Sequence, residues 1–364
     1  DGAITQIFTE EGLVGIGEGS PYEDPARIKE YTETHIRPLL IGKNPFDIEA
    51  LCNRGNESRR SRAPWAGVDV ACWDLIGKAV GKPVYELLCT EGTPRRQIAI
   101  YASGGVEHAW YENGAEALIR EALRHREAGY DAFKFRPGTD WQAAGMTLEK
   151  YAPILERLRD AVGPEFRLMH EGLGMSLGSL EAIISDFAPL LEKLGFYWFE
   201  EAFGGTNIDH IDLFIRLKEA MPTVRVSGGE RFRERFEAQV WLDREALDIV
   251  QTDCNVTGLT ENWYIARMAH LRGISLIPHN WHGGGTTMAN AHLVAAIANG
   301  EYCELNQTYN PLKEGIFKKP LTVENGVMTL PDRPGLGVEL IDDLGKRFPF
   351  QPGSYQKPNR RVES

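Results

Sequence analysis

Residues 196–203 read FYWFEEAF, an apolar run that ends in two adjacent acids, Glu200 and Glu201. A strand inside a parallel sheet is buried on both faces, so it carries apolar residues without polar alternation. The run therefore predicts a buried parallel strand. Because neighbouring side chains on a strand point to opposite faces, we expect Glu200 to point toward a site at the strand end. Glu201 is then expected to face the helix layer or a nearby basic side chain.

The same kind of strand recurs along residues 96–320, each time followed by an amphipathic helix pattern. We expect strands at 98–103, 132–138, 167–172, 196–201, 224–230, 248–253, 275–280 and 302–307. Strands that alternate with helices are typical of a parallel sheet covered by helices. Eight even units predict a (β/α)8-type, TIM-like barrel of the α/β class. A doubly wound open sheet is the alternative.

The segments before and after this region lack the alternation of strands and helices. Residues 4–18 predict a hairpin with a Glu-Gly turn, and helical patterns follow at 25–40, 45–53 and 64–80. Beyond residue 320, the pair Asn325-Gly326 predicts a second hairpin turn. We therefore expect an N-terminal capping domain (1–95), a barrel domain (96–320) and a C-terminal segment (321–364). The last segment is expected to return to the first, so that both flanks form one α+β cap.

The composition excludes several classes of protein. The 364-residue chain is 42% hydrophobic and has a net charge of −12, with acids and bases interspersed. A negative chain without a basic stripe disfavours nucleic acids and membrane surfaces as partners. No apolar run reaches the length of a membrane span, and no secretory signal is visible. Five scattered cysteines without a C-x-x-C pair indicate free thiols in a reducing cytoplasm.

Ionisable side chains stand at the carboxyl end of nearly every expected strand, where barrels of this kind have their active sites. The candidate site residues are Lys134, Arg136, Glu171, Glu200, Glu230, Asp253, His279 and Glu304. From Glu171 to Glu200 and from Glu200 to Glu230 the spacing is about 30 residues, roughly one βα unit. We therefore expect these side chains to surround one opening.

Glu171, Glu200 and Glu230 stand on three successive strands, and three carboxylates in one pocket repel each other. A hard divalent cation removes that repulsion. Oxygen ligands with open positions for water or substrate suit Mg²⁺ better than Zn²⁺. Each acid alone is better explained as a solvated strand end or an ion-pair partner, but three on successive strands at even spacing favour a metal site.

Two further pairs complete the expected opening. Lys134 and Arg136 are two residues apart on one strand and so share a face; as an alternative, both are solvated surface cations. Asp253 and His279 end neighbouring strands, where a carboxylate fixes the tautomer of an imidazole and raises its basicity. The plainer alternatives are a helix cap for Asp253 and a packed loop histidine for His279.

Together these motifs resemble the enolase superfamily, in its mandelate racemase branch and the acid-sugar dehydratases within it. The resemblance covers nearly the whole chain. It is carried by GVDVACWDLIGKAVGKPVYELL (67–88), by FKFR, MHEG, WFEEA, SGGE, VQTD and IPHN at the successive strand ends, and by PDRPGLGVEL (331–340). It implies a modified barrel with a capping domain, a sugar-acid substrate, an essential Mg²⁺ and a homo-oligomer.

The resemblance also implies roles for the candidate residues. Glu171, Glu200 and Glu230 hold the metal, and the Asp253–His279 dyad serves one face of the substrate. Lys134 serves the opposite face, and Glu304 hydrogen-bonds the substrate carboxylate or the intermediate. The implied reaction removes the proton alpha to a carboxylate and eliminates the beta-hydroxyl, which gives a 2-keto-3-deoxy acid.

Departures from the family pattern keep other outcomes open. Arg136 stands where the racemases have a second lysine, and its high pKa makes it a poor base, so two-base racemisation is disfavoured; Arg136 is either catalytic or a clamp for a substrate carboxylate. Glu171 replaces the more usual Asp. The chain is expected to lack the family's first strand and substrate-covering loop. An epimerase, a cycloisomerase and a non-catalytic sugar-acid binder are the alternatives to a dehydratase.

The segment HGGGTT (282–287) has two readings. Late loops of such barrels often bind phosphate, but no P-loop lysine follows here. We therefore expect a flexible loop that leads into a helix from Met288. His282 is a further candidate acid near the site.

Overall fold

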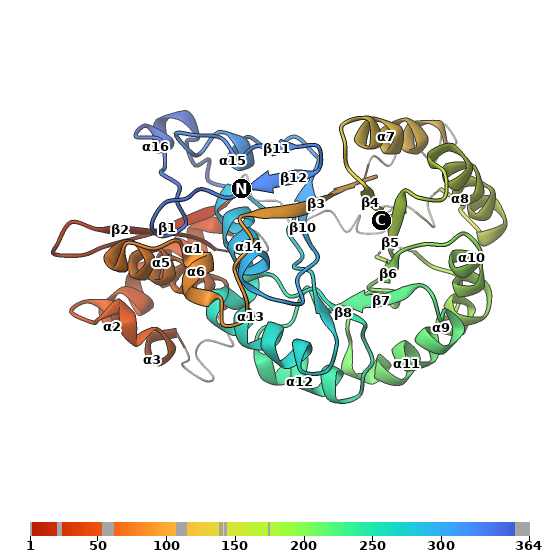
Figure 1. Ribbon diagram of the computed structural model, residues 1–364, viewed down its shortest axis with the longest axis horizontal. Helices are drawn as coiled ribbons and strands as arrows, with labels where there is room; N and C mark the ends of the chain where they lie inside the picture. Colours follow the sequence, from red (N-terminus) through yellow and green to blue (C-terminus); the bar gives the residue numbers. More distant parts are fainter. Residues whose placement is uncertain are drawn as a thin grey trace.

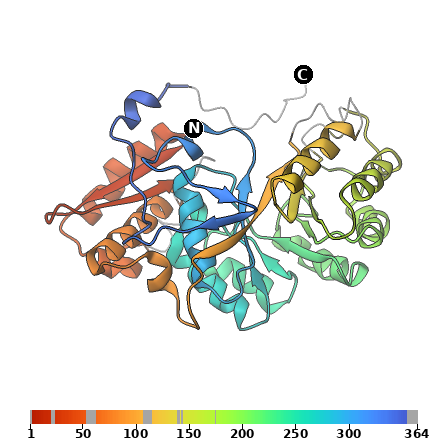
Figure 2. The ribbon, with the colours of Figure 1, turned by 45° about the horizontal axis from the view of Figure 1, so that its top comes forward.

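The computed structural model describes residues 2–19, 24–52, 62–106, 115–137, 141, 144–173 and 175–353 (Figure 1). A ring of strands surrounded by helices forms the larger part, and the N-terminal segment packs at one side of it (Figures 1 and 2). None of the described helices is long and apolar enough to cross a membrane. Residues 354–364 of the predicted C-terminal segment lie outside the described residues.

The N-terminal part consists of a hairpin and a group of helices. Strands β1 (Ala3–Phe8) and β2 (Val14–Gly19) pair antiparallel, as the sequence predicts. The helices are α1 (Pro25–Tyr31), η1 (Thr32–Ile36), α2 (Arg37–Leu40), η2 (Pro45–Asp47), α3 (Ile48–Cys52), α5 (Arg62–Val80) and α6 (Val84–Leu88). Helix α5 lies directly against β2, where a Cβ added at Gly17 would be 1.9 Å from the carbonyl oxygen of Gly67. Gly15, whose Cβ would lie 2.2 Å from the carbonyl oxygen of Ala71, and Gly17 are therefore required by this close approach.

All eight predicted barrel strands are confirmed, although most are shorter than expected. They are β3 (Gln97–Gly104), β4 (Ala132–Phe135), β5 (Arg167–Glu171), β6 (Trp198–Glu200), β7 (Arg225–Gly228), β8 (Ile249–Val250), β9 (Ser275–Leu276) and β10 (Tyr302–Asn306). Each pairs in parallel with the next from β3 to β9, and β10 pairs in parallel with β3. This order confirms the (β/α)8-type barrel and excludes the open doubly wound sheet.

The ring closes between β9 and β10 without a strand ladder among the described residues. Two other groups of hydrogen bonds cross this seam. The backbone N–H of Leu276 donates to the carbonyl of Asn299 (3.1 Å). Asn280 donates its side-chain Nδ2–H to the carbonyl of Glu304 (2.9 Å) and its backbone N–H to the Glu304 carboxylate (2.7 Å). A predicted site residue thus also helps to close the barrel.

Helices cover the outside of the ring (Figure 1). The main outer helices are α7 (Glu116–Glu127), α8 (Leu148–Val162), α9 (Leu180–Ala182) with η4 (Ile183–Phe187) and α10 (Ala188–Lys193), α11 (Ile211–Ala220), α12 (Arg235–Asp243), α13 (Cys254–His270) and α14 (Gly284–Ala296). A separate apolar cluster from the strands includes Tyr101, Met169, Trp198, Ile249 and Ile277. This cluster lies among the strands of the ring, so apolar side chains pack the barrel interior.

The C-terminal segment differs in part from the expectation. Hairpin β11 (Val323–Glu324) and β12 (Val327–Thr329) forms at the predicted Asn325-Gly326 turn, but β12 pairs antiparallel with β3 of the barrel. Strand β4 pairs with β3 only from Ala102 onward, and β12 pairs with the earlier residues 97–99. The chain then reaches the N-terminal part, where the N–H of Leu336 donates to Asp74 on α5 (2.7 Å). Helices α15 (Pro311–Glu314) and α16 (Leu344–Arg347) flank these contacts.

Candidate active site

The structure brings the predicted site residues together at the carboxyl end of the strand ring. Each lies in a barrel strand or within a few residues after one, in or beyond β4 to β10. Each of these side chains lies close to at least one other member of the set. The set comprises Lys134, Arg136, Glu171, Glu200, Glu230, Asp253, His279 and Glu304.

Three carboxylates form the first group. Glu171, Glu200 and Glu230 each offer an oxygen within 4.8 Å of the others, and all three side chains are buried. Burial raises the pKa of Glu171 to about 7 and also raises the pKa of Glu200. The raised pKa values show that burial destabilises the ionised form of these carboxylates, and a bound divalent cation would stabilise that form. The all-oxygen donor set and the burial therefore fit Mg²⁺.

Lys134 lies between this group and the eighth strand. Its Nζ contacts an oxygen of Glu200 at 2.6 Å and an oxygen of Glu304 at 2.9 Å. Burial alone would lower the pKa of Lys134, but the charges of Glu200, Glu304 and Glu171 outweigh it and raise that pKa well above the ordinary value. Lys134 is consequently a fixed cation at neutral pH rather than a base.

Arg136 lies nearer the solvent than Lys134 does. One guanidinium nitrogen is 3.8 Å from an oxygen of Glu171, and the side chain keeps 29% of its surface exposed. The guanidinium also lies over the ring of Trp281, 5.6 Å from its centroid. Arg136 follows β4 and Trp281 follows β9, so this contact joins separate strand ends at the opening.

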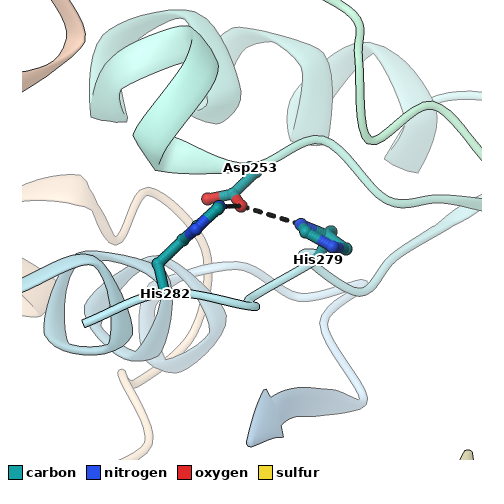
Figure 3. Close-up of side chains that lie close together, drawn as sticks. All are labelled: Asp253, His279 and His282. Carbon is teal, nitrogen blue, oxygen red and sulfur yellow. Dashed lines mark hydrogen bonds and ion pairs between the residues drawn. The ribbon is translucent and has the colours of Figure 1, made fainter. Parts of the chain in front are cut away.

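Asp253 and His279 form the expected pair. His279 Nδ1 lies 2.9 Å from Asp253 Oδ2, and His282 Nε2 lies 2.8 Å from the same oxygen (Figure 3). Burial would raise the pKa of Asp253, but the charge and hydrogen bond of His282 and the hydrogen bond of His279 hold it well below its usual range. Asp253 also accepts the N–H of Asn255 and so caps helix α13. Asp253 thus both caps α13 and lies beside His279.

His279 contacts a metal-site carboxylate as well as Asp253. Its Nε2 lies 3.3 Å from an oxygen of Glu230. Burial would lower the pKa of His279, but the charge of Glu230 and the hydrogen bond to Asp253 raise it to about 10. His279 therefore stands between the carboxylate group and Asp253, where a base acting on a substrate held by that group would need to be.

Glu304 remains ionised on the far side of the opening. Burial would raise its pKa, but the charges of Lys134 and His279 outweigh this effect and lower the pKa to about 2. The backbone N–H of Asn280 donates to its Oε2. Glu304 is thus a fixed anion that balances Lys134.

Glu201 does not behave as strand alternation predicts. Its backbone has a φ of 47°, in the left-handed region, so β6 ends at Glu200 and the alternation stops there. The buried carboxylate accepts the N–H of Gly229 (2.7 Å), and among the described residues it forms no ion pair with the expected basic side chain. Burial and the charge of Glu230 raise its pKa to about 8.

Two buried partners of the site were not predicted from the sequence. Gln251 donates its side-chain N–H to the second oxygen of Glu200 (2.7 Å). Glu18, on β2 of the N-terminal hairpin, accepts the backbone N–H groups of Gly283 (3.1 Å) and Thr286 (2.8 Å). The only signal for Glu18 is an acid set among the glycines of that hairpin strand.

Glu18 also explains why the segment after His282 is helical. Helix α14 begins at Gly284 rather than at the predicted Met288. The carboxylate of Glu18 satisfies two of the N–H groups that a helix start leaves without intrahelical partners. A Cβ at Gly283 would lie 2.5 Å from Glu18 Oε1. The glycines of this segment therefore make room for an acid, and the predicted flexible loop is wrong.

Comparisons with known proteins agree with this architecture. Residues 2–89 match the family model described as mandelate racemase / muconate lactonizing enzyme, N-terminal domain, and residues 117–344 match the model described as enolase C-terminal domain-like. Arabinonate dehydratase of Saccharolobus solfataricus is 32% identical over 352 residues, which cover 94% of this chain and 89% of that protein.

Two further relatives are cycloisomerases. D-galactarolactone cycloisomerase of Agrobacterium fabrum is 29% identical, with 95% of this chain and 90% of that protein covered. The crystal structure of the 3,6-anhydro-D-galactonate cycloisomerase from Zobellia galactanivorans superposes with a TM-score of 0.80 at 29% identity, and the match covers 95% of this chain and 93% of that one. Similar proteins thus act on sugar acids or their lactones with different outcomes.

Proposed function

Because the chain belongs to the mandelate racemase / muconate lactonizing enzyme family of the enolase superfamily, we propose that it is a Mg²⁺-dependent dehydratase of a sugar acid, an aldonate or an aldarate. The observation that carries this proposal is the buried His279–Asp253 pair beside three clustered carboxylates, with Lys134 in contact with one of them. The name of the arabinonate dehydratase relative supports the dehydratase outcome.

Glu171, Glu200 and Glu230 are the proposed metal ligands. When bound, Mg²⁺ supplies a Lewis acid that stabilises negative charge on the substrate carboxylate as the alpha proton leaves. The remaining chemistry is proposed for the residues around these ligands. Lys134 adds a fixed positive charge where negative charge develops, and the ionised Glu304 accepts a hydrogen bond from a hydroxyl of the substrate or the intermediate.

The proposed reaction begins with proton transfer to His279. The charge of Glu230 that raises the pKa of His279 would be offset by a cation bound at the three carboxylates, so that His279 is neutral when it takes the proton alpha to the carboxylate. Asp253 orients the ring and stabilises the imidazolium that forms. The carbon–hydrogen electron pair moves into the enediolate. The enediolate then expels the beta-hydroxyl, to which His279 returns its proton, so water leaves. The resulting enol tautomerises to a 2-keto-3-deoxy acid. Arg136 is proposed to bind a substrate carboxylate, since a guanidinium presents paired N–H donors that match a carboxylate.

Cycloisomerisation is the second candidate, because two of the similar proteins are named cycloisomerases. It begins with the same proton abstraction, but the bond that then breaks is not the one to the beta-hydroxyl. Epimerisation is disfavoured since Lys134, on the opposite face, is locked as a cation between Glu200 and Glu304. A non-catalytic binder is disfavoured by the intact His279–Asp253 pair.

The test is a panel of aldonic acids, aldaric acids and their lactones with Mg²⁺ in D₂O. Appearance of a 2-keto-3-deoxy acid supports dehydration, and deuterium at C2 without loss of water indicates epimerisation. A ring-opened product without loss of water indicates cycloisomerisation. Tight binding without deuterium exchange indicates a binder. Failure to form any 2-keto-3-deoxy product across the panel would refute the dehydratase proposal.

A cytoplasmic location and a homo-oligomeric assembly complete the proposal. The location is supported by five cysteines that are all free thiols, since unpaired thiols are typical of a reducing compartment. The assembly is supported by membership of the family alone. Size-exclusion chromatography with light scattering tests it.

A further inference from the structure

His282 lies beside the proposed dyad, and the proposed reaction does not use it. Its side chain is buried, and its Nε2 is 2.8 Å from Oδ2 of Asp253. His279 Nδ1 is 2.9 Å from that same oxygen. Figure 3 shows the two imidazoles approaching the carboxylate from different sides, and their ring planes are inclined by 70°. One carboxylate oxygen therefore serves two histidines.

The other oxygen of Asp253 is also held by two groups. Oδ1 accepts the backbone N–H of Asn255 (2.9 Å) and the side-chain N–H of Asn290 (3.2 Å). Rotation of the carboxylate would break contacts at both oxygens. The orientation that Asp253 presents to His279 is therefore fixed by groups that do not take part in the proton transfer.

The segment that carries His282 is anchored from the N-terminal part. The next residue, Gly283, donates its backbone N–H to Glu18, and Thr286 donates to the other oxygen of the same carboxylate. Glu18 is itself buried, on β2. A chain of contacts thus runs from the hairpin through Glu18 and the first turn of α14 to His282, Asp253 and His279.

We propose that His282 is a positioning residue, which holds Oδ2 of Asp253 so that it receives the Nδ1–H of His279, and that Glu18 fixes His282 from the capping part. This inference rests on the proposed role of His279 as the base. His282 acts through Asp253, since its Nε2 lies 2.8 Å from Oδ2 of that carboxylate. Docking of the N-terminal part thereby sets the geometry of a dyad that belongs entirely to the barrel.

Two substitutions at His282 separate the hydrogen bond from the packing. The terminal amide nitrogen of glutamine takes nearly the place of a histidine Nε2, so His282→Gln keeps a donor to Asp253, whereas His282→Leu fills the space without one. Outer partners that orient active-site groups are typically worth tenfold to a hundredfold in activity. We expect kcat of His282→Leu to fall by about that factor with KM nearly unchanged, and His282→Gln to keep most of its kcat.

His292→Leu is the matched control. His292 is another buried histidine of α14, but its ring contacts the N–H of Tyr85 and the carbonyl of Leu336, away from Asp253. This variant should lose stability and keep the wild-type kcat. The inference is overturned if His282→Leu keeps wild-type kcat, or if His282→Gln loses as much as His282→Leu. Glu18→Ala should lower kcat in the same direction, and an unchanged kcat there would overturn the part assigned to Glu18.

A measurement without substrate separates this inference from the proposed function. The Nδ1 proton of His279, hydrogen-bonded and buried, should give a downfield NMR signal, assigned by its loss in His279→Asn. We expect the signal to persist in His282→Gln and to broaden or disappear in His282→Leu. An unchanged signal in His282→Leu would overturn the inference. If no sugar acid is turned over, the proposed function fails while this comparison still decides the role of His282.

Discussion

Lys134 offers the most demanding test of the site's electrostatics. Its Nζ lies 2.6 Å from Glu200 and 2.9 Å from Glu304, and all three side chains are almost fully buried. Replacing it with methionine keeps much of the volume but leaves two carboxylates without their shared cation. Removing one partner of a buried ion pair costs about 3–5 kcal/mol. The loss of stability is limited because one of the two carboxylates can take up a proton. Protonation costs about 1.4 kcal/mol for each unit by which the pKa of that carboxyl group lies below the pH.

Urea unfolding with and without Mg²⁺ measures this effect. Without Mg²⁺, we expect Lys134→Met to lower the free energy of unfolding by about 3–5 kcal/mol. Mg²⁺ should stabilise the variant more than the wild type, because Glu200 is then a stronger ligand. Lys78→Met is the control. Lys78 pairs with Asp74 at 2.6 Å on α5, away from the three carboxylates, so the loss of unfolding free energy in this variant should be the same with and without Mg²⁺. A loss below about 1 kcal/mol, or equal stabilisation of both proteins by Mg²⁺, would refute the reasoning.

Three further substitutions test separate parts of the molecule. His279→Asn should reduce formation of the 2-keto-3-deoxy acid by about 10²–10⁴-fold with Mg²⁺ binding retained in calorimetry; surviving turnover would mean that another group is the base. Glu230→Gln should weaken Mg²⁺ binding by about tenfold or more, and unchanged affinity would exclude Glu230 as a ligand. Burial would raise the pKa of Glu301, but hydrogen bonds from Arg225 and Ser275 and the charge of Arg225 lower it from 4.5 to about 2. Its ionised form therefore stabilises the fold above pH 4.5, and this contribution is lost as the pH falls toward 2. Glu301→Gln should be less stable than wild type at pH 7, with a difference that shrinks between pH 4.5 and 2; a difference that stays constant over that range would contradict the assignment.

The barrel could be predicted from sequence because its signals are local and repeated. A buried run such as residues 196–200 has few other interpretations, and eight of them in register leave only a few sheet topologies. The candidate site followed from the same logic. Parallel strands all end at one edge, so acids at the ends of β5 and β6 come together without any knowledge of loop structure.

The details that the sequence did not predict depend on contacts between distant segments. Glu201 was assigned by strand alternation, but its left-handed backbone and its bond to Gly229 end that alternation. The start of α14 was misplaced because its capping acid, Glu18, lies 265 residues earlier than Gly283 in the chain. Propensity rules read helix starts from neighbouring residues. A cap supplied by another part of the fold therefore leaves no local signal.

The seam between β9 and β10 has a consequence for how the molecule matures. Elsewhere in the ring, backbone ladders join neighbouring strands, but Asn280 and Glu304 share in closing this gap, and Glu304 also contacts Lys134. Completing the barrel and completing the charge balance of the opening are thus one assembly event. A chain that has not yet closed its ring therefore lacks the contacts that hold Glu304 beside Lys134.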